Sequence, residues 1–208
     1  MNISLNPNLA KAGSGGSSRI DSKGKYIGTI EWARVYSIPT GSTWVEFKFV
    51  SLLEQEAKVS LCILNKDGEA TYGLKKLQAM MACCKIRELT QTNMTVNIWN
   101  FDTSQMEDTE QVVYKEFCGA NIGLLLYRHD KTSNSGNDFF QMELEAPFAA
   151  DTEQTAAEVL DQMPAKQLEK MVQTLRDKDD RTSGNASSDF YQQASGQQDN
   201  FCDDSIPF

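Results

Sequence analysis

Apolar and polar residues alternate between residues 25 and 64 in three short runs, which is the pattern of half-buried β-strands. In the second run Val45, Phe47 and Phe49 share one face, so we expect that face to lie in the core. Turn residues such as Pro39 and Gly41 separate the runs. The three predicted strands are Tyr26–Tyr36, Thr43–Leu52 and Lys58–Leu64.

The apolar period changes to that of a helix after residue 72. Apolar residues there recur at spacings of three and four, which predicts an amphipathic helix over about Gly73–Arg87. Its stripe consists of Leu74, Leu77, Met81 and Cys84. Alternating runs then resume as four further predicted strands, with polar hairpin tips near 103–109 and 131–137: Thr95–Phe101, Val112–Phe117, Ile122–Arg128 and Phe139–Ala146.

A second helical stretch is expected after residue 150. Asp151 followed by Gln154 has the spacing of a capping box. We expect the helix to break near Pro164, which fits the first turn of a continuing helix. The apolar face of this helix comprises Leu168, Met171, Val172 and Leu175. Beyond Lys178 the chain is rich in Asp, Ser, Gly, Gln and Asn without apolar periodicity, so we expect disorder there.

The order of these elements indicates the fold class. Six or seven short strands with one helix between the third and fourth favour a mostly β fold, a small Greek-key barrel of the OB type. A β-sandwich or an α+β sheet uses the same elements and stays an alternative. We expect a flexible Gly- and Ser-rich N-terminal segment (1–24), the OB-like domain (25–150), a helical extension (151–178) and a disordered acidic tail (179–208).

The net charge of −9 argues against a nucleic-acid partner, because phosphate-binding proteins are usually basic. The distribution of the charge weakens that argument. Residues 25–130 hold 11 basic and 13 acidic residues, whereas residues 177–208 hold two basic and seven acidic ones. The predicted barrel is therefore nearly neutral, and a basic groove on its surface is compatible with the composition.

The inventory of reactive side chains does not suggest an enzyme. The single histidine, His129, stands beside Asp130 near a predicted hairpin tip, and we expect it to be a solvated loop residue. No catalytic triad order, P-loop or metal-spaced carboxylate set is present, so we expect no catalytic residues and no cofactor. The five cysteines lack a C-x-x-C spacing, which predicts reduced thiols and no metal site.

No run of about 18 apolar residues and no signal-peptide pattern occurs, so we expect no membrane association. Together with the predicted reduced thiols, this favours a cytoplasmic protein.

The last six residues carry the most specific motif of the chain. It is acidic at first and ends in an apolar Ile-Pro-Phe, and Pro207 lowers the cost of ordering the segment on docking. Phe208 offers a ring for an apolar pocket and a carboxylate for a cation beside it. The motif resembles the acidic tip of bacterial single-stranded DNA-binding proteins, Asp-Asp-Asp-Ile-Pro-Phe, with Ser205 in place of the third aspartate. The resemblance implies a partner-binding hook formed by Asp203, Asp204, Ile206, Pro207 and Phe208.

Residues 1–176 are similar to single-stranded DNA-binding proteins encoded by bacteriophages. Short motifs carry this resemblance: Ser17-Ser18-Arg19-Ile20, Met80-Met81-Ala82-Cys83, Ile122-Gly123-Leu124, Ala146-Pro147-Phe148 and Thr155-Ala156-Ala157-Glu158. The resemblance implies an OB-like fold, action in the cytoplasm of an infected bacterium, and a role in DNA replication or recombination.

Candidate DNA-binding residues follow from the predicted strand faces, because single strands are held by stacked aromatic rings and by cations along the phosphates. Trp44 and Lys48 point away from the predicted core face of their strand. In the first strand, Ile30 and Ala33 share one core only if a bulge shifts the register between them. Outward aromatic and basic residues then give the predicted interface: Trp32, Arg34, Tyr36, Trp44, Lys48 and Trp99.

These observations predict a protein that binds and protects single-stranded DNA without strong sequence preference. The terminal hook is expected to recruit replication and repair proteins of the host or the phage. The alternative is a protein-interaction module that captures host replication factors through the hook without binding DNA itself. The sequence leaves the oligomeric state open.

Overall fold

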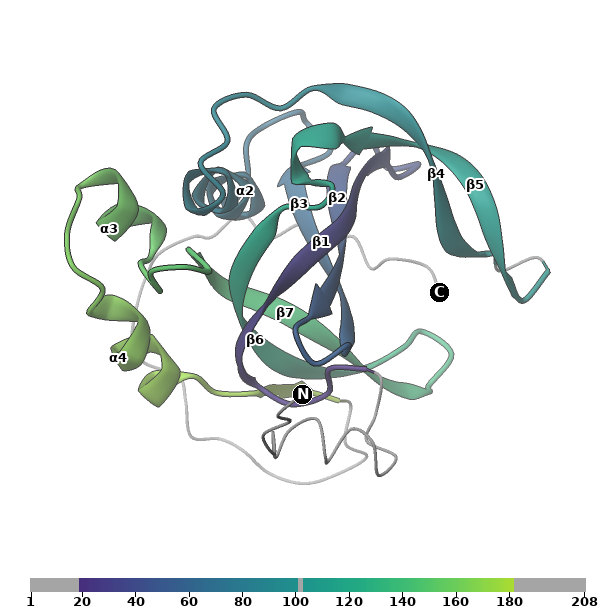
Figure 1. Ribbon diagram of the computed structural model, residues 1–208. Helices are drawn as coiled ribbons and strands as arrows, with labels where there is room; N and C mark the ends of the chain where they lie inside the picture. The colour runs from purple at the N-terminus through teal and green to yellow at the C-terminus, as the bar shows by residue number, and fades with distance from the viewer. Residues whose placement is uncertain (1–18, 101–102, 182–208) are drawn as a thin grey trace, which may run out of the picture.

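A computed structural model describes residues 19–100 and 103–181, and these residues form a mostly β structure with short helices (Figure 1). Its strands make one eight-stranded sheet, antiparallel except for the last strand. No helix in the described ranges is long and apolar enough to cross a membrane. In chain order the elements are β1 (Gly24–Ser37), β2 (Thr43–Ser51), β3 (Glu56–Leu64), α2 (Tyr72–Cys83), β4 (Gln91–Asn100), β5 (Gln105–Tyr114), a 3₁₀ turn (Lys115–Phe117), β6 (Asn121–Thr132), β7 (Asp138–Phe148), α3 (Ala156–Leu160), α4 (Gln167–Thr174) and β8 (Lys178–Asp180).

Strand β1 is shared between two parts of the sheet. Strand β6 pairs with its residues Gly24–Thr29, and β2 pairs with its residues Gly28–Ser37. The β1–β2 register shifts between Ile30 and Trp32, as predicted, so a bulge bends the strand just after its last pair with β6. At Gly28 a Cβ atom would lie 2.1 Å from the carbonyl oxygen of Val50, so only glycine allows the strands to approach this closely there.

The main core lies inside the curved sheet and is closed by α2 (Figure 1). Val45, Phe47 and Phe49 of β2 are fully buried, which confirms the predicted core face. Helix α2 contributes Leu77, Met80 and Cys83 as its most buried residues and packs against β3 and β7.

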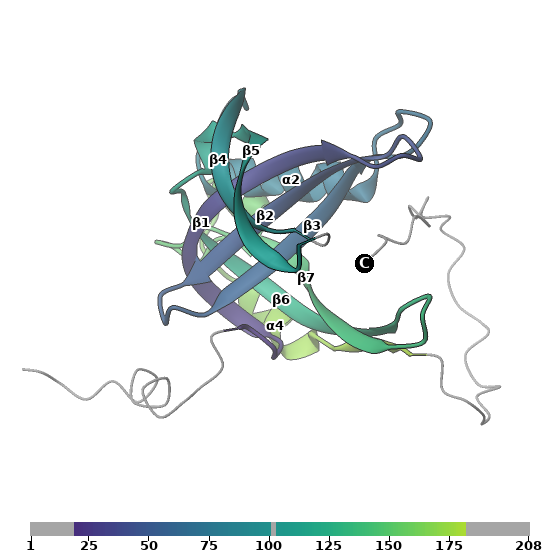
Figure 2. The same ribbon diagram turned by 90° about the vertical axis from the view of Figure 1, so that its right-hand side faces the viewer.

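Hairpin β4–β5 projects from the body of the protein (Figures 1 and 2). Its two strands pair without interruption from Gln91 opposite Tyr114 to Asn100 opposite Gln105. The hairpin joins the rest of the sheet where Val113 pairs with Arg34 of β1. Strand β5 begins at Gln105, so the predicted polar tip near residues 103–109 is mostly strand.

The helical extension consists of two short helices, with the predicted break near Pro164 between them. The predicted capping box is wrong, because Thr155 and Glu158 form it, not Asp151 and Gln154. Glu158 is 1% exposed and accepts hydrogen bonds from the backbone N–H groups of Thr155, Lys166 and Gln167. One buried carboxylate therefore holds the start of α3 and the start of α4 together.

Disorder was expected from Asp179 onward, and this is wrong for Asp179 and Asp180. Residues 178–180 form β8, which pairs in parallel with β6, and Asp180 accepts a hydrogen bond from His129. The spacing of apolar residues cannot predict this pairing, because polar contacts to β6, a strand distant in the sequence, hold the segment. Residues 1–18, Phe101 and residues 182–208, including the predicted hook, lie outside the described residues.

The predicted state of the cysteines is confirmed only in part. Cys83, Cys84 and Cys118 carry free thiols, and burial raises the pKa of Cys84 to about 12, so this thiol is protonated at neutral pH. Cys62 is disulfide-bonded, so the prediction of reduced thiols is wrong at this residue. Sequence spacing does not reveal which sulfur atoms the fold brings within bonding distance.

The carboxylate of Glu158 gives a test of the C-terminal packing. We expect Glu158→Gln to lower the free energy of unfolding by about 1–3 kcal/mol. The glutamate carboxylate accepts hydrogen bonds on two oxygen atoms, whereas the glutamine amide has only one acceptor oxygen, so some donors would lose their partner. Urea denaturation measures the difference. Glu153→Gln is the matched control, since Glu153 forms an exposed ion pair with Lys25 and its loss should change stability by no more than about 1 kcal/mol. Equal effects of the two substitutions would contradict this role of Glu158.

The same residue predicts a dependence on pH. Burial raises the pKa of Glu158, but the backbone N–H donors of Thr155, Lys166 and Gln167 outweigh this effect and lower the pKa to about 2. The stabilising contribution is therefore present above the ordinary glutamate pKa of about 4.3 and is lost as the pH falls from there. Stability measured between about pH 5 and about pH 2 should fall more steeply in the wild type than in Glu158→Gln. Parallel curves would contradict the assignment.

Candidate nucleic-acid interface

Five of the six predicted DNA-binding residues lie on one face of β1 and β2. The strands place Trp32 opposite Lys48 and Tyr36 opposite Trp44. Arg34 stands opposite Glu46 between these two pairs. Because paired residues of an antiparallel ladder point to the same side, these side chains form one row, on the side opposite the core. We call this surface, together with its continuation on β3, the ladder face.

Strand β3 extends the ladder face. It sets Cys62 opposite Trp44, Ser60 opposite Glu46 and Lys58 opposite Lys48. Lys58 is exposed and was missed from the sequence. The alternation of apolar and polar residues predicts that Lys58 points away from the core. Its position beside Lys48 depends on the β2–β3 register, which this alternation does not specify.

Aromatic rings occupy one end of the ladder face. Trp44 and Tyr36 are half-buried, and the guanidinium of Arg34 lies 4.9 Å from the centre of the Tyr36 ring. Burial and the nearby Glu46 carboxylate raise the pKa of Tyr36, so its hydroxyl stays protonated. The buried indole Nε1 of Trp44 has no hydrogen-bond partner among the described residues. A buried donor without a partner costs free energy, so a ligand oxygen that reached it would bind favourably.

The predicted cations of the ladder face are already paired with carboxylates. Arg34 donates to Glu46 at 2.7 Å, and this pair is mostly buried, with side chains 22% and 9% exposed. Lys48 lies 2.8 Å from Glu31 and 3.6 Å from Glu56. These contacts raise the pKa of Lys48 although burial alone would lower it. The ladder face is consequently not a strongly basic groove.

Trp32 is not the exposed ring that the sequence suggested. It points away from the main core, as predicted, but it is only 1% exposed because the β4–β5 hairpin covers it. Val96 and Val113 of the hairpin are its buried neighbours. The prediction that Trp32 faces solvent is wrong because strand alternation specifies a side of the sheet and not what later segments of the chain place over that side.

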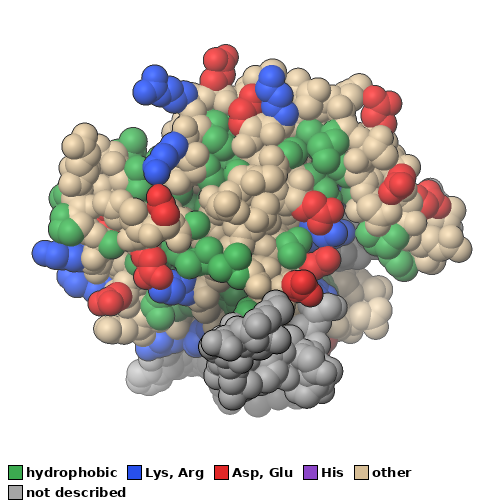
Figure 3. Space-filling view, in the orientation of Figure 1, with side chains coloured by type: hydrophobic (Ala, Val, Ile, Leu, Met, Phe, Trp, Pro, Cys, Tyr) green, Lys and Arg blue, Asp and Glu red, His purple; other side chains and the backbone are tan. Residues whose placement is uncertain are grey.

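Trp99 does not join the ladder face. Val113 pairs with Arg34 of β1 and with Thr92 of β4, so all three side chains point to the side of the ladder face. Trp99 is seven residues after Thr92 in the same strand. Because side chains alternate along a strand, Trp99 points to the opposite side of the hairpin. The ring is 43% exposed. Figure 3 shows acidic and hydrophobic side chains, and no Lys or Arg, over the hairpin at the right of the view. The structure therefore separates Trp99 from the other candidates.

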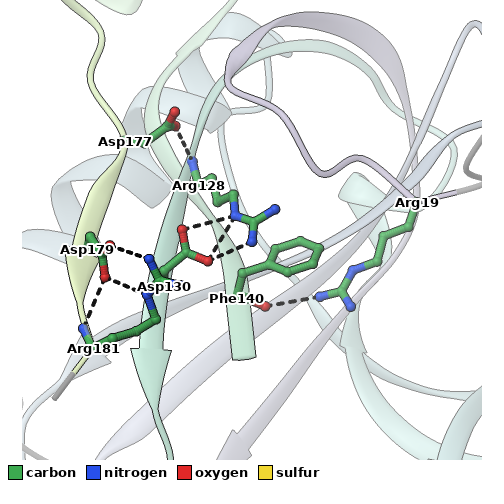
Figure 4. Close-up of polar contacts among 7 residues, drawn as sticks. All are labelled: Arg19, Arg128, Asp130, Phe140, Asp177, Asp179 and Arg181. Atoms are coloured by element: carbon green, nitrogen blue, oxygen red, sulfur yellow. Dashed lines mark hydrogen bonds and ion pairs between the residues drawn. The ribbon is translucent and has the colours of Figure 1, made fainter. Parts of the chain in front are cut away.

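A second cluster of cations and an aromatic ring lies on β6 and β7 (Figure 4). Arg19 and Arg128 each place their guanidinium 4.2 Å from the centre of the Phe140 ring. Arg128 also forms a salt bridge with Asp130. The backbone of Arg19 forms a β-bridge with Glu56, whose carboxylate forms an ion pair with Lys48. These contacts join the cluster to the ladder face. The sequence did not reveal it, because Arg19 is more than a hundred residues away from Arg128 and Phe140.

His129 is buried in β6 and is not the predicted solvated loop residue. Its Nδ1 lies 2.7 Å from Glu143, and its Nε2 lies 2.6 Å from Asp180 of β8. Burial raises the pKa of Glu143, but hydrogen bonds from Tyr127, Lys131 and His129 lower it to about 2. This network connects β6, β7 and β8 and is structural. No group of three or more metal-binding side chains occurs among residues 19–100 and 103–181.

Comparison of the chain with models of protein families gives no match, and comparison with curated proteins gives none either. The function is therefore inferred from the ladder face and from the sequence motifs.

The position of Trp32 under the hairpin predicts a large loss of stability when its ring is removed. We expect Trp32→Ala to destabilise the fold by about 3–5 kcal/mol, because it opens a cavity between the sheet and the hairpin. Thermal unfolding followed by circular dichroism measures this loss. Trp99→Ala, which removes a largely exposed ring of the same type, is the control and should change stability far less. Wild-type stability of Trp32→Ala would contradict the burial.

Proposed function

We propose that the protein binds single-stranded DNA along the ladder face, without strong sequence preference, during DNA replication or recombination. The observation that carries the proposal is the row of side chains in which the half-buried rings of Tyr36 and Trp44 lie on the same face as Lys48 and the exposed Lys58. Rings that stack on bases, flanked by cations that contact phosphates, are the common means of binding single strands. The role is non-catalytic and belongs in the cytoplasm of a bacterial host.

The path of the sheet supports an OB-like barrel. The meander β1–β2–β3 is followed by helix α2, and β6 returns to pair with the first half of β1 before it turns into β7. This is the connectivity of five-stranded OB barrels, with β4–β5 as an additional hairpin between the helix and the fourth barrel strand. OB barrels bind oligonucleotides across the sheet that includes their second and third strands, which is where the ladder face lies.

The charges of the ladder face favour stacking over phosphate contacts as the source of affinity. Arg34 and Lys48 are paired with carboxylates, and the free cation nearest them is Lys58 among the described residues of this face. A protein that contacts few phosphates releases few counterions from DNA, so its affinity depends only weakly on the salt concentration. Stacking requires accessible base faces, which a duplex hides. The proposal therefore implies a preference for single strands that persists at moderate salt.

The hook at Asp203–Phe208 gives the second part of the proposal, recruitment of replication and repair proteins. Its support is the order of residues that it shares with the tip of bacterial single-stranded DNA-binding proteins. A protein-interaction module that carries the hook but does not bind DNA is the competing function. The paired cations of the ladder face and the net charge of −9 favour that alternative.

Substitution of Trp44 distinguishes the two functions. We expect Trp44→Ala to weaken binding of a labelled oligonucleotide by about 1–3 kcal/mol, the value of one stacked base. Trp99→Ala is the matched control, because its ring lies on the opposite side of the hairpin and should leave the affinity unchanged. Fluorescence anisotropy at low and moderate salt measures both variants and compares single-stranded with duplex DNA. No binding by the wild type, or equal affinity for the two forms of DNA, would reject the DNA-binding function.

Substitution of Phe208 tests the hook. We expect Phe208→Ala to abolish capture of replication and repair proteins from a bacterial lysate, because it removes the ring that fills the partner's pocket. The DNA affinity of this variant should match the wild type. Removing residues 182–208, which leaves β8 intact, should keep or raise DNA affinity at low salt, since the segment carries four acidic residues and no basic one. An unchanged set of captured proteins with Phe208→Ala would reject the hook.

A further inference from the structure

Strand β4 is an edge strand without the features that normally protect an edge. It lies at the end of the strand order, so one side of its backbone has no neighbouring strand among the described residues. Its sequence, Gln-Thr-Asn-Met-Thr-Val-Asn-Ile-Trp-Asn, contains no charged residue, no proline and no glycine. The ten pairs with β5 contain no bulge. Natural proteins usually block such an edge with lysine, proline or a bulge, because it otherwise pairs with another strand.

Of the two strands of the hairpin, only the inner one is charged. Glu107, Asp108 and Glu110 all belong to β5, whereas β4 has none. Residues 91–114 contain no Lys or Arg, so nothing on the hairpin attracts a phosphate backbone. This composition disfavours nucleic acid as the occupant of the edge. The uncharged edge favours pairing with another uncharged strand, because no two like charges would then face each other across the two paired strands.

We propose that β4 pairs antiparallel with β4 of a second copy of this chain, which joins two sheets into one across a twofold axis. A twofold axis perpendicular to the sheet keeps each face continuous, so paired positions must differ by an even number of residues. An axis at Thr95 satisfies this requirement. It pairs Thr95 with itself, Asn93 with Asn97, Gln91 with Trp99, Met94 with Val96, and Thr92 with Ile98.

The apolar side chains of the hairpin support this arrangement. Trp99 and Met106 stand opposite each other on one side of the hairpin and are 43% and 48% exposed. In the paired arrangement Trp99 lies beside Gln91 of the second copy, which itself neighbours Tyr114. Two such contacts, related by the axis, shield rings that are exposed in the single chain. Uncharged partners in register, with Thr95 opposite Thr95, give favourable cross-strand pairs along the whole strand.

Measurement of the mass in solution tests the dimer. We expect sedimentation equilibrium without DNA to give twice the 23.3 kDa mass of the chain. Thr95→Lys should raise the dimer dissociation constant at least about tenfold, because two ammonium groups would meet at the axis. Glu110→Lys is the matched control: Glu110 pairs with Thr95 within the hairpin but lies one strand away from the edge, so this variant should stay dimeric. Circular dichroism establishes that each variant is folded.

A second variant tests the register even if Thr95→Lys does not fold. Thr95→Cys should give, under mild oxidation, a cross-link between two chains that peptide mapping assigns to position 95 in both, since paired strands bring Cα atoms within disulfide range. A monomeric wild type, a dimer unaffected by Thr95→Lys, or cross-links from position 95 only to other positions would overturn the proposal. The mass is measured without DNA, so failure of the DNA-binding function would leave this test intact.

Discussion

In β1 the pairing with β2 shifts register between Ile30 and Trp32, and the arrangement of the sheet depends on that single irregularity. Strand β2 pairs with β1 on both sides of the shift, whereas β6 pairs with β1 only before it and β5 only after it, at Arg34. The extra residue brings Ala33 into the same core as Ile30. It also turns Trp32 and Arg34 to the other side of the sheet. The ladder face and the attachment of the hairpin both follow from that change of side.

Carboxylates perform, at the C-terminal side of the structure, the role that apolar packing performs in the core. Glu158 connects two short helices by accepting backbone hydrogen bonds from both. Glu143 and Asp180 hold His129 between β7 and β8. Several donors surround the carboxylates of Glu143 and Glu158, which favours their ionised forms although burial alone would raise their pKa values. Segments with little apolar surface, such as β8, are thereby fixed to the sheet.

The surface divides into regions of different chemistry. The ladder face combines half-buried rings with cations that are mostly paired, which suits binding by stacking more than binding by charge. The outer strand of the β4–β5 hairpin is uncharged, whereas its inner strand is acidic, which suits pairing of the outer strand with another protein strand. Trp44 lies on the ladder face and Trp99 on the hairpin, although the same argument from strand alternation predicted both as DNA-binding residues.

Local sequence patterns were enough to predict most strands of the sheet, the inward faces of Val45, Phe47 and Phe49, and the bulge in β1. These features are local, because the alternation of side chains along a strand fixes which residues share a side. The proposed hook also rests on local sequence alone, since the order of the last six residues is its whole signal. Only the tertiary structure decided that Trp32 is covered, that His129 is buried, and that Lys58 lies beside Lys48. These depend on which distant segment lies over or next to a strand, and neither periodicity nor composition carries that information.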